Sequence, residues 1–494
     1  MGTRAHELVG QVVASRVARR LVVSAVVLAA LAGAPPPAGA DSVDDYIRAQ
    51  MVRRKIPGLA LAVVQGGQVV KLAGYGLASV ELEAPVTPDT VFELASVTKQ
   101  FTATAIMQLA EEGKVGVDDP VAKYLPGTPP AWQAITIRHL LTHTAGLAKL
   151  EESFGALWKN GVRMDTTTGQ AFDAATKDPM SFAPGDGWQY SDVGYFLLGM
   201  VIEKVSGQRY AAFLADHFFV PLGMTSTSVI NQWAIVPHRA PGYTLRNDQL
   251  ARIRRDAQFA LPSHYGVLSS VRDLVKWEAA LDRAQVLTPS SLAAMWTPVR
   301  LNDGSQRPYG FGWFVTERRG HRLIEHPGIT GTQFSRFPDD HLTVIVLTNL
   351  GYRLEGQEVD AWGLTHGVAG LYLPGLLLSG VAKEPDPDPV RTEHIRAFLE
   401  HLGRGEDAPE ALPGLTAALR PSMEEIKRVF GKRMAELRSL TYITTDTRPA
   451  GSESLGVPVR EQVHYEMVTA SETRYFSFWL GADGRVINFV SYPD

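Results

Sequence analysis

Three short stretches of this 494-residue sequence carry side chains whose types and spacing could break an acyl bond. The first holds Ser96 and Lys99 in an S-x-x-K pattern, which occurs once in the chain. Residues three positions apart share one face of a helix, and these two stand at the start of an amphipathic helix expected over 98–112. A serine hydroxyl is a weak nucleophile until a neighbouring group removes its proton. The pattern therefore indicates a nucleophile with its activating lysine, but a capping serine beside a solvated lysine gives the same letters.

The second stretch places Tyr190 and Asp192 after a turn at Pro184-Gly185 and before a helix expected over 194–206. A phenol and an ammonium group both have pKa values near 10, so neither is a base at neutral pH. Held beside a lysine in a cleft that excludes water, Tyr190 would titrate together with it as one unit. The alternative is a half-buried loop tyrosine that only packs.

The third stretch is Glu325-His326-Pro327-Gly328, at the end of an expected strand. His326 could donate to a substrate carbonyl or carry a proton at physiological pH. Gly328 would let the backbone approach a ligand closely, because it has no Cβ. A lone histidine is more often structural, so the interpretation of this stretch as part of an active site depends on the other two stretches.

Strands at both ends of the catalytic region must position these residues. Apolar runs flank the Gly66-Gly67 turn, whereas the chain between about 118 and 260 is mostly helical with long loops. Four more strands are expected after it, at 312–316, 322–325, 332–337 and 342–348. We therefore expect an α/β (α+β) fold in which an antiparallel sheet, flanked by helices, is assembled from both ends around an inserted helical subdomain.

The chain divides into a leader and two domains. Arginines precede a 14-residue apolar run at 21–34, and small residues close the segment at Ala38-Gly39-Ala40. The run is shorter than the ~20 residues of a membrane span, so residues 1–40 are predicted to be a signal peptide and the protein to be periplasmic or secreted. A hydrolase domain is expected over 41–382. Alternating Pro and Asp make 383–391 a linker, followed over 392–494 by a small α+β domain with its helices first and an antiparallel sheet after.

Composition excludes several classes of protein. There are 48 Lys and Arg against 52 Asp and Glu, so no bulk charge favours nucleic acid. The sequence has 0 Cys, which removes disulfides and thiolate chemistry. His139 and His143 are spaced like a zinc pair on a helix, but the intervening residues lack the glutamate of H-E-x-x-H, and no third ligand is evident. We expect neither a cofactor nor a metal.

Taken together and in this order, the three stretches resemble the motifs of the serine β-lactamase and penicillin-binding-protein superfamily, in particular its class-C-like branch of esterases and D-peptidases. That family carries S-x-x-K, then Y-x-N, then K-T-G or H-x-G. Framework stretches are similar as well, and the resemblance covers about residues 42 to 350. They are ITIRHLLTHTAGL at 135–147, YSDVGYFLLGMVIEKVSG at 190–207, PLGM at 221–224, YGFGW at 309–313 and VIVLTN at 344–349.

The resemblance implies a β-lactamase-like fold and a role for each site residue. Ser96 would be the acylated nucleophile, Lys99 its activator and Tyr190 the general base and acid. Gly328 matches the last glycine of the third motif. The backbone N–H groups of Ser96 and Ile329 would form the oxyanion hole.

Two residues depart from the family pattern. Asp192 replaces the asparagine of Y-x-N, and an ionised carboxylate accepts hydrogen bonds but cannot donate them. His326 replaces a lysine, and so removes a permanent cation that would hold a substrate carboxylate. Both changes favour an uncharged acyl substrate, hence an ester, over a β-lactam.

The sequence thus predicts an exported serine hydrolase that works through an acyl-enzyme on Ser96 and cleaves a small ester or a related acyl substrate. A D-Ala carboxypeptidase, a D-aminopeptidase or a β-lactamase acting on cell-wall substrates is the alternative among enzymes. A non-catalytic receptor for peptidoglycan fragments is the alternative of another class. The oligomeric state is left open.

Overall fold

The computed structural model describes residues 38–148, 164–231, 233–253, 257–259, 261–351, 361–406, 431, 434, 436–448, 453–454, 457–470 and 473–492. The predicted signal peptide therefore lies outside the described residues, apart from its last three positions. These begin helix α2 (Ala38–Arg54). By its internal contacts the chain divides into a unit of residues 1–46 and a larger unit of residues 47–494, and the second is described below.

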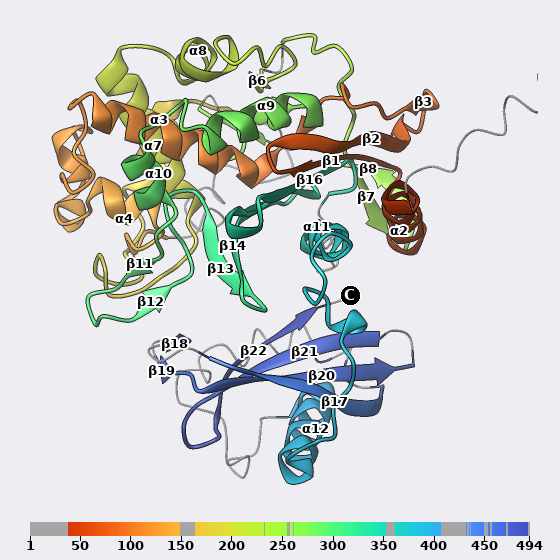
Figure 1. The fold of residues 1–494 in the computed structure, drawn as a ribbon. Helices are drawn as coiled ribbons and strands as arrows, with labels where there is room; N and C mark the ends of the chain where they lie inside the picture. The colour runs from red at the N-terminus through yellow and green to blue at the C-terminus, as the bar shows by residue number, and fades with distance from the viewer. Residues whose placement is uncertain are drawn as a thin grey trace, which may run out of the picture. The chain divides into compact units, whose positions relative to one another are not determined.

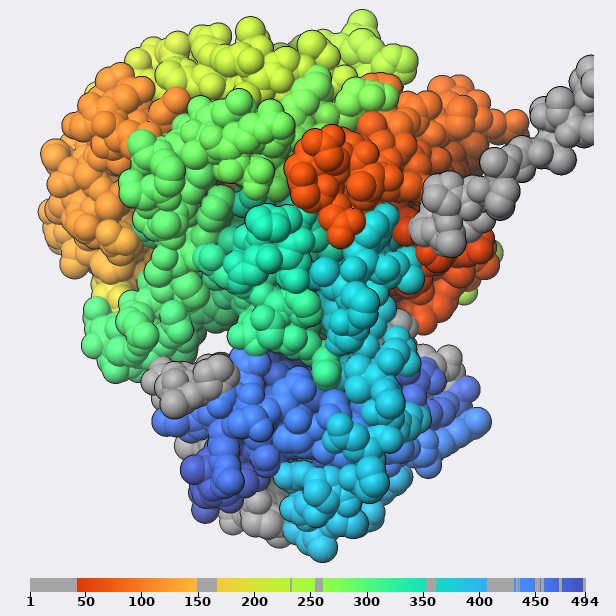
Figure 2. Space-filling view, in the orientation of Figure 1, coloured from red at the N-terminus to blue at the C-terminus, as the bar shows by residue number. Residues whose placement is uncertain are grey.

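A seven-stranded antiparallel sheet forms the centre of the catalytic region, with the order β13-β14-β15-β16-β1-β2-β3. Strand β1 pairs with β16 from Leu59 opposite Thr348 to Gln65 opposite Leu342, so the two ends of the region join in the middle of the sheet, as expected. Its strands are β1 (Gly58–Gln65), β2 (Gln68–Ser79), β3 (Ala84–Pro85), β13 (Phe314–Arg318), β14 (His321–Gly328), β15 (Thr332–Phe337) and β16 (Leu342–Thr348). Figure 2 shows the red-orange N-terminal part and the green and teal later parts in direct contact.

Helices cover both faces of this sheet. All seven residues of β16 are buried, as its apolar, β-branched sequence suggests. Helix α9 (Val271–Asp282) contacts β1 and β16, and helix α11 (Ala361–Gly370) contacts β15 and β16 (Figure 1). Phe334 packs in the main apolar core, whereas its neighbour Ser335 contacts Thr365 of α11. Successive strand residues point to opposite faces, so α11 covers the face away from that core.

Helices and short strands lie between β3 and β13, and the bounds of about 118–260 for a helical insert stay a prediction. The core of this part joins α3 to α7 and α9, with the Phe101 and Trp277 rings 4.4 Å apart. The helices are α3 (Lys99–Glu111), α4 (Ile137–Leu141), α6 (Thr168–Ala175), α7 (Asp192–Ser206), α8 (Tyr210–Leu214) and α10 (Pro289–Met295). The short strands are β4 (Phe92–Glu93), β5 (Met164–Thr166), β6 (Ser228–Val229), β7 (Tyr243–Arg246), β8 (Gln249–Arg252), β9 (Ala257–Phe259), β10 (Val267–Ser269), β11 (Val299–Arg300) and β12 (Gln306–Arg307).

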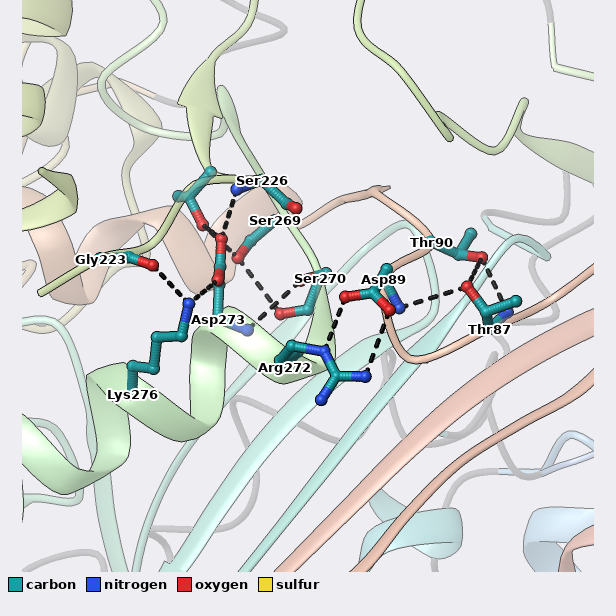
Figure 3. A network of polar contacts seen from close by, with 11 residues as sticks. Thr87, Asp89, Thr90, Gly223, Ser226, Ser269, Ser270, Arg272, Asp273 and Lys276 are labelled. Atoms are coloured by element: carbon teal, nitrogen blue, oxygen red, sulfur yellow. Dashed lines mark hydrogen bonds and ion pairs between the residues drawn. The ribbon is translucent and has the colours of Figure 1, made fainter.

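A polar network fixes the start of α9 beside the small sheet β4-β10-β6 (Figure 3). The buried carboxylate of Asp273 accepts from the Ser226 N–H at 2.7 Å, from the Thr227 hydroxyl at 3.0 Å and from the Lys276 ammonium at 2.8 Å. Arg272 makes two hydrogen bonds to Asp89, at 2.6 and 3.2 Å. These contacts anchor β10, the neighbour of β4, and β4 leads directly to Ser96.

The tail domain has the predicted helix followed by an antiparallel sheet. Helix α12 (Pro389–Gly403) packs on a sheet with the order β17-β20-β21-β22. The ring centres of Phe398 on the helix and Phe489 on β22 are 5.6 Å apart. The strands of this sheet are β17 (Leu437–Thr447), β20 (Glu461–Thr469), β21 (Thr473–Leu480) and β22 (Val486–Tyr492), and β18 (Glu453–Ser454) pairs with β19 (Val457–Pro458) in a separate two-stranded sheet.

One boundary differs from the expectation. Helix α12 begins at Pro389, inside the linker predicted over 383–391. Proline interrupts a helix in its interior but is favourable in the first turn, because the N–H that it lacks would have no helical acceptor there. Asp388 caps this turn by accepting from the Arg391 N–H at 3.0 Å.

Candidate active site

Ser96 lies in a 3₁₀ turn (Ala95–Thr98) that runs directly into α3, which confirms its expected place at the start of a helix. The preceding residue, Ala95, has a left-handed φ of 47°, a conformation that costs a non-glycine residue about 1–2 kcal/mol. Neighbouring strands hold this turn in place. The Leu94 N–H donates to Val267 O at 2.9 Å, and the Thr332 hydroxyl donates to Leu94 O at 2.8 Å. The fold thus holds a partly exposed serine in a strained, well-anchored turn.

Lys99 is completely buried beneath this serine. Its Nζ donates to Ser96 Oγ at 3.1 Å, to Asp192 Oδ1 at 2.5 Å and to the backbone oxygen of His264 at 2.9 Å. An ammonium has three protons to donate, so these three acceptors use all of them. The cation also lies 4.8 Å from the centre of the Tyr190 ring. Lys99 is therefore held as an ammonium in contact with the hydroxyl that it would activate.

Asp192 is the partly exposed partner of Lys99 in an ion pair. Burial lowers the pKa of Lys99, and the Asp192 carboxylate opposes that effect. Burial alone would raise the pKa of Asp192, but the charge of Lys99 and its hydrogen bond bring that pKa below its usual value. The 2.5 Å distance between Lys99 Nζ and Asp192 Oδ1 is the geometry of a charge-assisted pair.

Tyr190 is brought to the same place by the loop before α7. Its ring centre lies 4.8 Å from Lys99 Nζ, and its side chain interacts with that of Ser96. Burial raises the pKa of Tyr190 well above 10, and the charge of Asp192 raises it further. Ser191 caps α7 by accepting from the Gly194 N–H at 3.3 Å, which fixes where the helix starts. Tyr190 is thus a neutral phenol in contact with the candidate nucleophile.

His326 is fully buried, and both of its ring nitrogens are engaged. Nε2 lies 2.9 Å from the Tyr309 hydroxyl, and Nδ1 lies 2.8 Å from Pro327 O. A carbonyl only accepts, so Nδ1 carries the proton and Nε2 accepts from Tyr309. Burial lowers the pKa of His326 to about 3, which makes the ring neutral. This differs from the expectation that His326 offers a donor to a substrate carbonyl, because the sequence did not show Tyr309 occupying the second nitrogen.

The hairpin between β14 and β15 packs against the turn that carries Ser96. A Cβ on Gly328 would lie 2.1 Å from Thr332 Oγ1 and 2.3 Å from Leu94 O, so only glycine fits. The Thr330 hydroxyl donates to Glu93 O at 2.6 Å, which ties the hairpin tip to β4. Ile329, at the tip, has 58% of its surface exposed. Within the described part of the chain, the hydrogen bonds include none from its backbone N–H, nor from that of Ser96.

The sequence argument missed the importance of His143. Helix α4 ends at Leu141, so His143 does not share a helix face with His139, and it has a left-handed φ of 62°. Its Nδ1 accepts from the Ser191 N–H at 3.1 Å, and its ring lies 4.3 Å from that of Tyr190. His143 therefore supports the Tyr190 loop. The described residues contain no cluster of three His, Cys, Asp or Glu side chains that could hold a metal.

Comparisons with known proteins identify the family and the fold of this chain. The family model described as Beta-lactamase matches residues 43–368. Penicillin-binding protein 4* of Bacillus subtilis is 30% identical over 486 residues, which covers 90% of this chain and 94% of that protein. The octameric penicillin-binding protein homologue from Pyrococcus abyssi has a TM-score of 0.58 at 22% identity, over 90% of this chain and 97% of that one. D-amino acid amidase from Ochrobactrum anthropi has a TM-score of 0.54 at 25% identity, over 63% of this chain and 92% of that one.

The chain therefore belongs to the beta-lactamase family, whose members are serine hydrolases. Its mixed fold of antiparallel sheets and helices is the fold of that family. Among the residues that the structure describes, no helix is both long and apolar enough to cross a membrane.

Proposed function

We propose that this protein is an exported serine hydrolase that cleaves small acyl substrates, with esters favoured, through an acyl-enzyme on Ser96. The observation that carries the proposal is the buried Lys99 beneath Ser96, with the Tyr190 ring beside it. Lys99 Nζ lies 3.1 Å from Ser96 Oγ and 4.8 Å from the centre of the Tyr190 ring, and the Tyr190 side chain interacts with that of Ser96. Export rests on the leader sequence at 1–40.

The proposed reaction begins when the Tyr190–Lys99 unit has lost one proton to solvent. Ser96 Oγ then attacks the carbonyl carbon of the substrate, and its proton passes to Tyr190. The carbonyl oxygen becomes an oxyanion that accepts from the N–H groups of Ser96 and Ile329. When the intermediate collapses, the bond to the leaving group breaks, and the leaving group takes the proton from Tyr190. The acyl group is then an ester of Ser96.

Deacylation follows the same path with water as the nucleophile. Tyr190 accepts a proton from water, which attacks the acyl carbon, and Ser96 recovers its proton as the acid product leaves. Lys99 is a positioning and charge-bearing residue throughout these steps, because it contacts Ser96 and Tyr190 without bonding to the substrate. A neutral His326 supplies no cation for a substrate carboxylate, which favours esters over β-lactams.

The test is hydrolysis of a short-chain p-nitrophenyl ester by the mature protein beside Ser96→Ala. We expect turnover that falls by at least about a thousandfold in the variant. Ser96→Ala activity within tenfold of the wild type would refute the proposal. If neither protein acts on the ester, D-alanyl peptides test the alternative of a D-peptidase. A fluorophosphonate then separates an enzyme from a receptor, because a pure receptor resists covalent labelling at Ser96.

A further inference from the structure

The charged groups of the site cancel at neutral pH. Lys99 contributes one positive charge and Asp192 one negative charge. Burial lowers the pKa of His326 to about 3 and that of His264 to about 4, so both rings are neutral. Burial also lowers the pKa of His143 well below its usual value. With an asparagine in place of Asp192, the same site would hold a net positive charge.

The two charges are not equally accessible to a substrate. The Lys99 side chain is 0% exposed and its three protons are already donated, whereas 27% of the Asp192 side chain is exposed. Lys99 occupies only Oδ1 of the carboxylate, and within the described residues Oδ2 has no hydrogen-bond donor. An incoming molecule therefore meets the negative member of the pair, with one oxygen ready to accept.

Asp192 lies within reach of the acyl part of a substrate on Ser96. Ser96 Oγ and Asp192 Oδ1 both contact Lys99 Nζ, at 3.1 and 2.5 Å, so they are separated by no more than the sum of these distances. A carbonyl carbon in position for attack lies about 3–3.5 Å from the nucleophile. An amine on the adjacent carbon is two bonds from that carbonyl carbon, each about 1.5 Å long, so it can lie up to about 6 Å from Ser96 Oγ, a distance that covers the upper limit for Asp192 Oδ1.

We propose that Asp192 is a specificity-determining residue that binds a protonated amine on the acyl part of the substrate. The preferred substrates are then α-aminoacyl esters and amides, ahead of the same compounds with an acylated amine or a carboxylate in its place. The amine donates a charge-assisted hydrogen bond to Oδ2 and restores the positive charge that Asp192 removes from the site. This inference rests on the proposed hydrolase function.

The experiment compares alanine p-nitroanilide with its N-acetyl and N-succinyl derivatives, for both enantiomers of alanine. The N-acetyl compound removes the positive charge, and the N-succinyl compound replaces it with a negative one. We expect the wild type to favour the free amine over the N-acetyl compound by at least tenfold in kcat/KM, with the N-succinyl compound slowest. Asp192→Asn should lose at least tenfold of that ratio.

The control variant is Asp282→Asn, which removes the same charge at an exposed position at the end of α9 and should leave the ratio unchanged. The measured quantity is the ratio of kcat/KM for the free amine to kcat/KM for the N-acetyl compound in the same variant. A general loss of catalysis caused by the substitution at Asp192 lowers both values and leaves this ratio unchanged. An unchanged ratio in Asp192→Asn, or a wild type that prefers the N-acetyl compound, would overturn the inference.

Binding to Ser96→Ala separates this inference from the hydrolase proposal. Calorimetry with alaninamide and N-acetylalaninamide needs no turnover. We expect alaninamide to bind Ser96→Ala at least tenfold more tightly, and the preference to disappear when Asp192→Asn is added. Tighter binding without Ser96-dependent turnover in the wild type would refute the hydrolase and retain the amine site. Equal binding of the two amides, or no binding of either, would refute the amine site.

Discussion

Replacing Asp192 by asparagine should move the pH dependence of the enzyme towards acid. The proposed attack requires the Lys99–Tyr190 unit to lose one proton first, because neither an ammonium nor a neutral phenol can take the proton of Ser96. Activity therefore appears as pH rises through the pKa of this unit. The Asp192 carboxylate favours the protonated unit, since its charge raises the proton affinity of both Lys99 and Tyr190. Removing that charge lowers the pKa of the unit.

The size of the shift follows from the distance and the burial. An opposite charge close by typically moves a pKa by about 1–3 units. The carboxylate lies 2.5 Å from Lys99 Nζ, and the Lys99 side chain is completely buried, so solvent screens the pair weakly. We therefore expect the acid limb of kcat/KM to shift down by about 2 pH units in Asp192→Asn. One unit corresponds to about 1.4 kcal/mol, so the change is about 3 kcal/mol in proton affinity.

The assay is kcat/KM for a neutral p-nitrophenyl ester between pH 5 and 10, for the wild type, Asp192→Asn and Asp282→Asn. The ester has no titrating group, so the acid limb reports the free enzyme. The profile of Asp282→Asn should overlay that of the wild type. An acid limb that stays in place in Asp192→Asn, or moves to higher pH, would show that the carboxylate does not hold the proton on the catalytic unit.

Three further substitutions test the surroundings of the site. Gly328→Ala should lower kcat/KM by at least about a hundredfold, because its Cβ would lie 2.1 Å from Thr332 Oγ1 and displace the hairpin, whereas an unchanged rate would refute the role of this packing. Tyr309→Phe removes the donor to His326 Nε2 and leaves that buried acceptor unpaired, so we expect about a tenfold loss in kcat together with a loss of about 1–3 kcal/mol in stability; an unchanged kcat in the folded variant would contradict a positioning role. Asp273→Ala should destabilise the protein by about 3 kcal/mol in urea unfolding, since it leaves buried donors unpaired, and a change below about 0.5 kcal/mol would contradict the anchoring of α9.

The sequence predicted the parts of the fold that local pattern determines. The seven buried residues of β16 and the paired strand β1 are apolar and β-branched, and the glycine turn between β1 and β2 fixes their hairpin. Ser96 could be placed at the start of a helix because the apolar spacing after it has the helical period. Each of these signals lies within a few neighbouring residues, which is why the sequence alone predicts the elements.

The charge state of the site could not be predicted in the same way. Lys99 and Asp192 lie 93 positions apart, and nothing in either neighbourhood indicates that they form an ion pair. The engagement of His326 by Tyr309 and the support of Tyr190 by His143 depend on burial and on long-range packing. The signal in the sequence is that Asp192 departs from the asparagine of Y-x-N, which marks the position but does not reveal its partner.

The most direct test of the central account is to find where an acyl group becomes attached. The protein is mixed with a p-nitrophenyl ester, quenched in acid within the first turnovers and digested for peptide mass spectrometry. We predict an acyl adduct on the peptide that contains Ser96, and its absence in Ser96→Ala. An adduct on another residue, or an unmodified Ser96 peptide while the released p-nitrophenol shows a stoichiometric burst, would contradict an acyl-enzyme on Ser96.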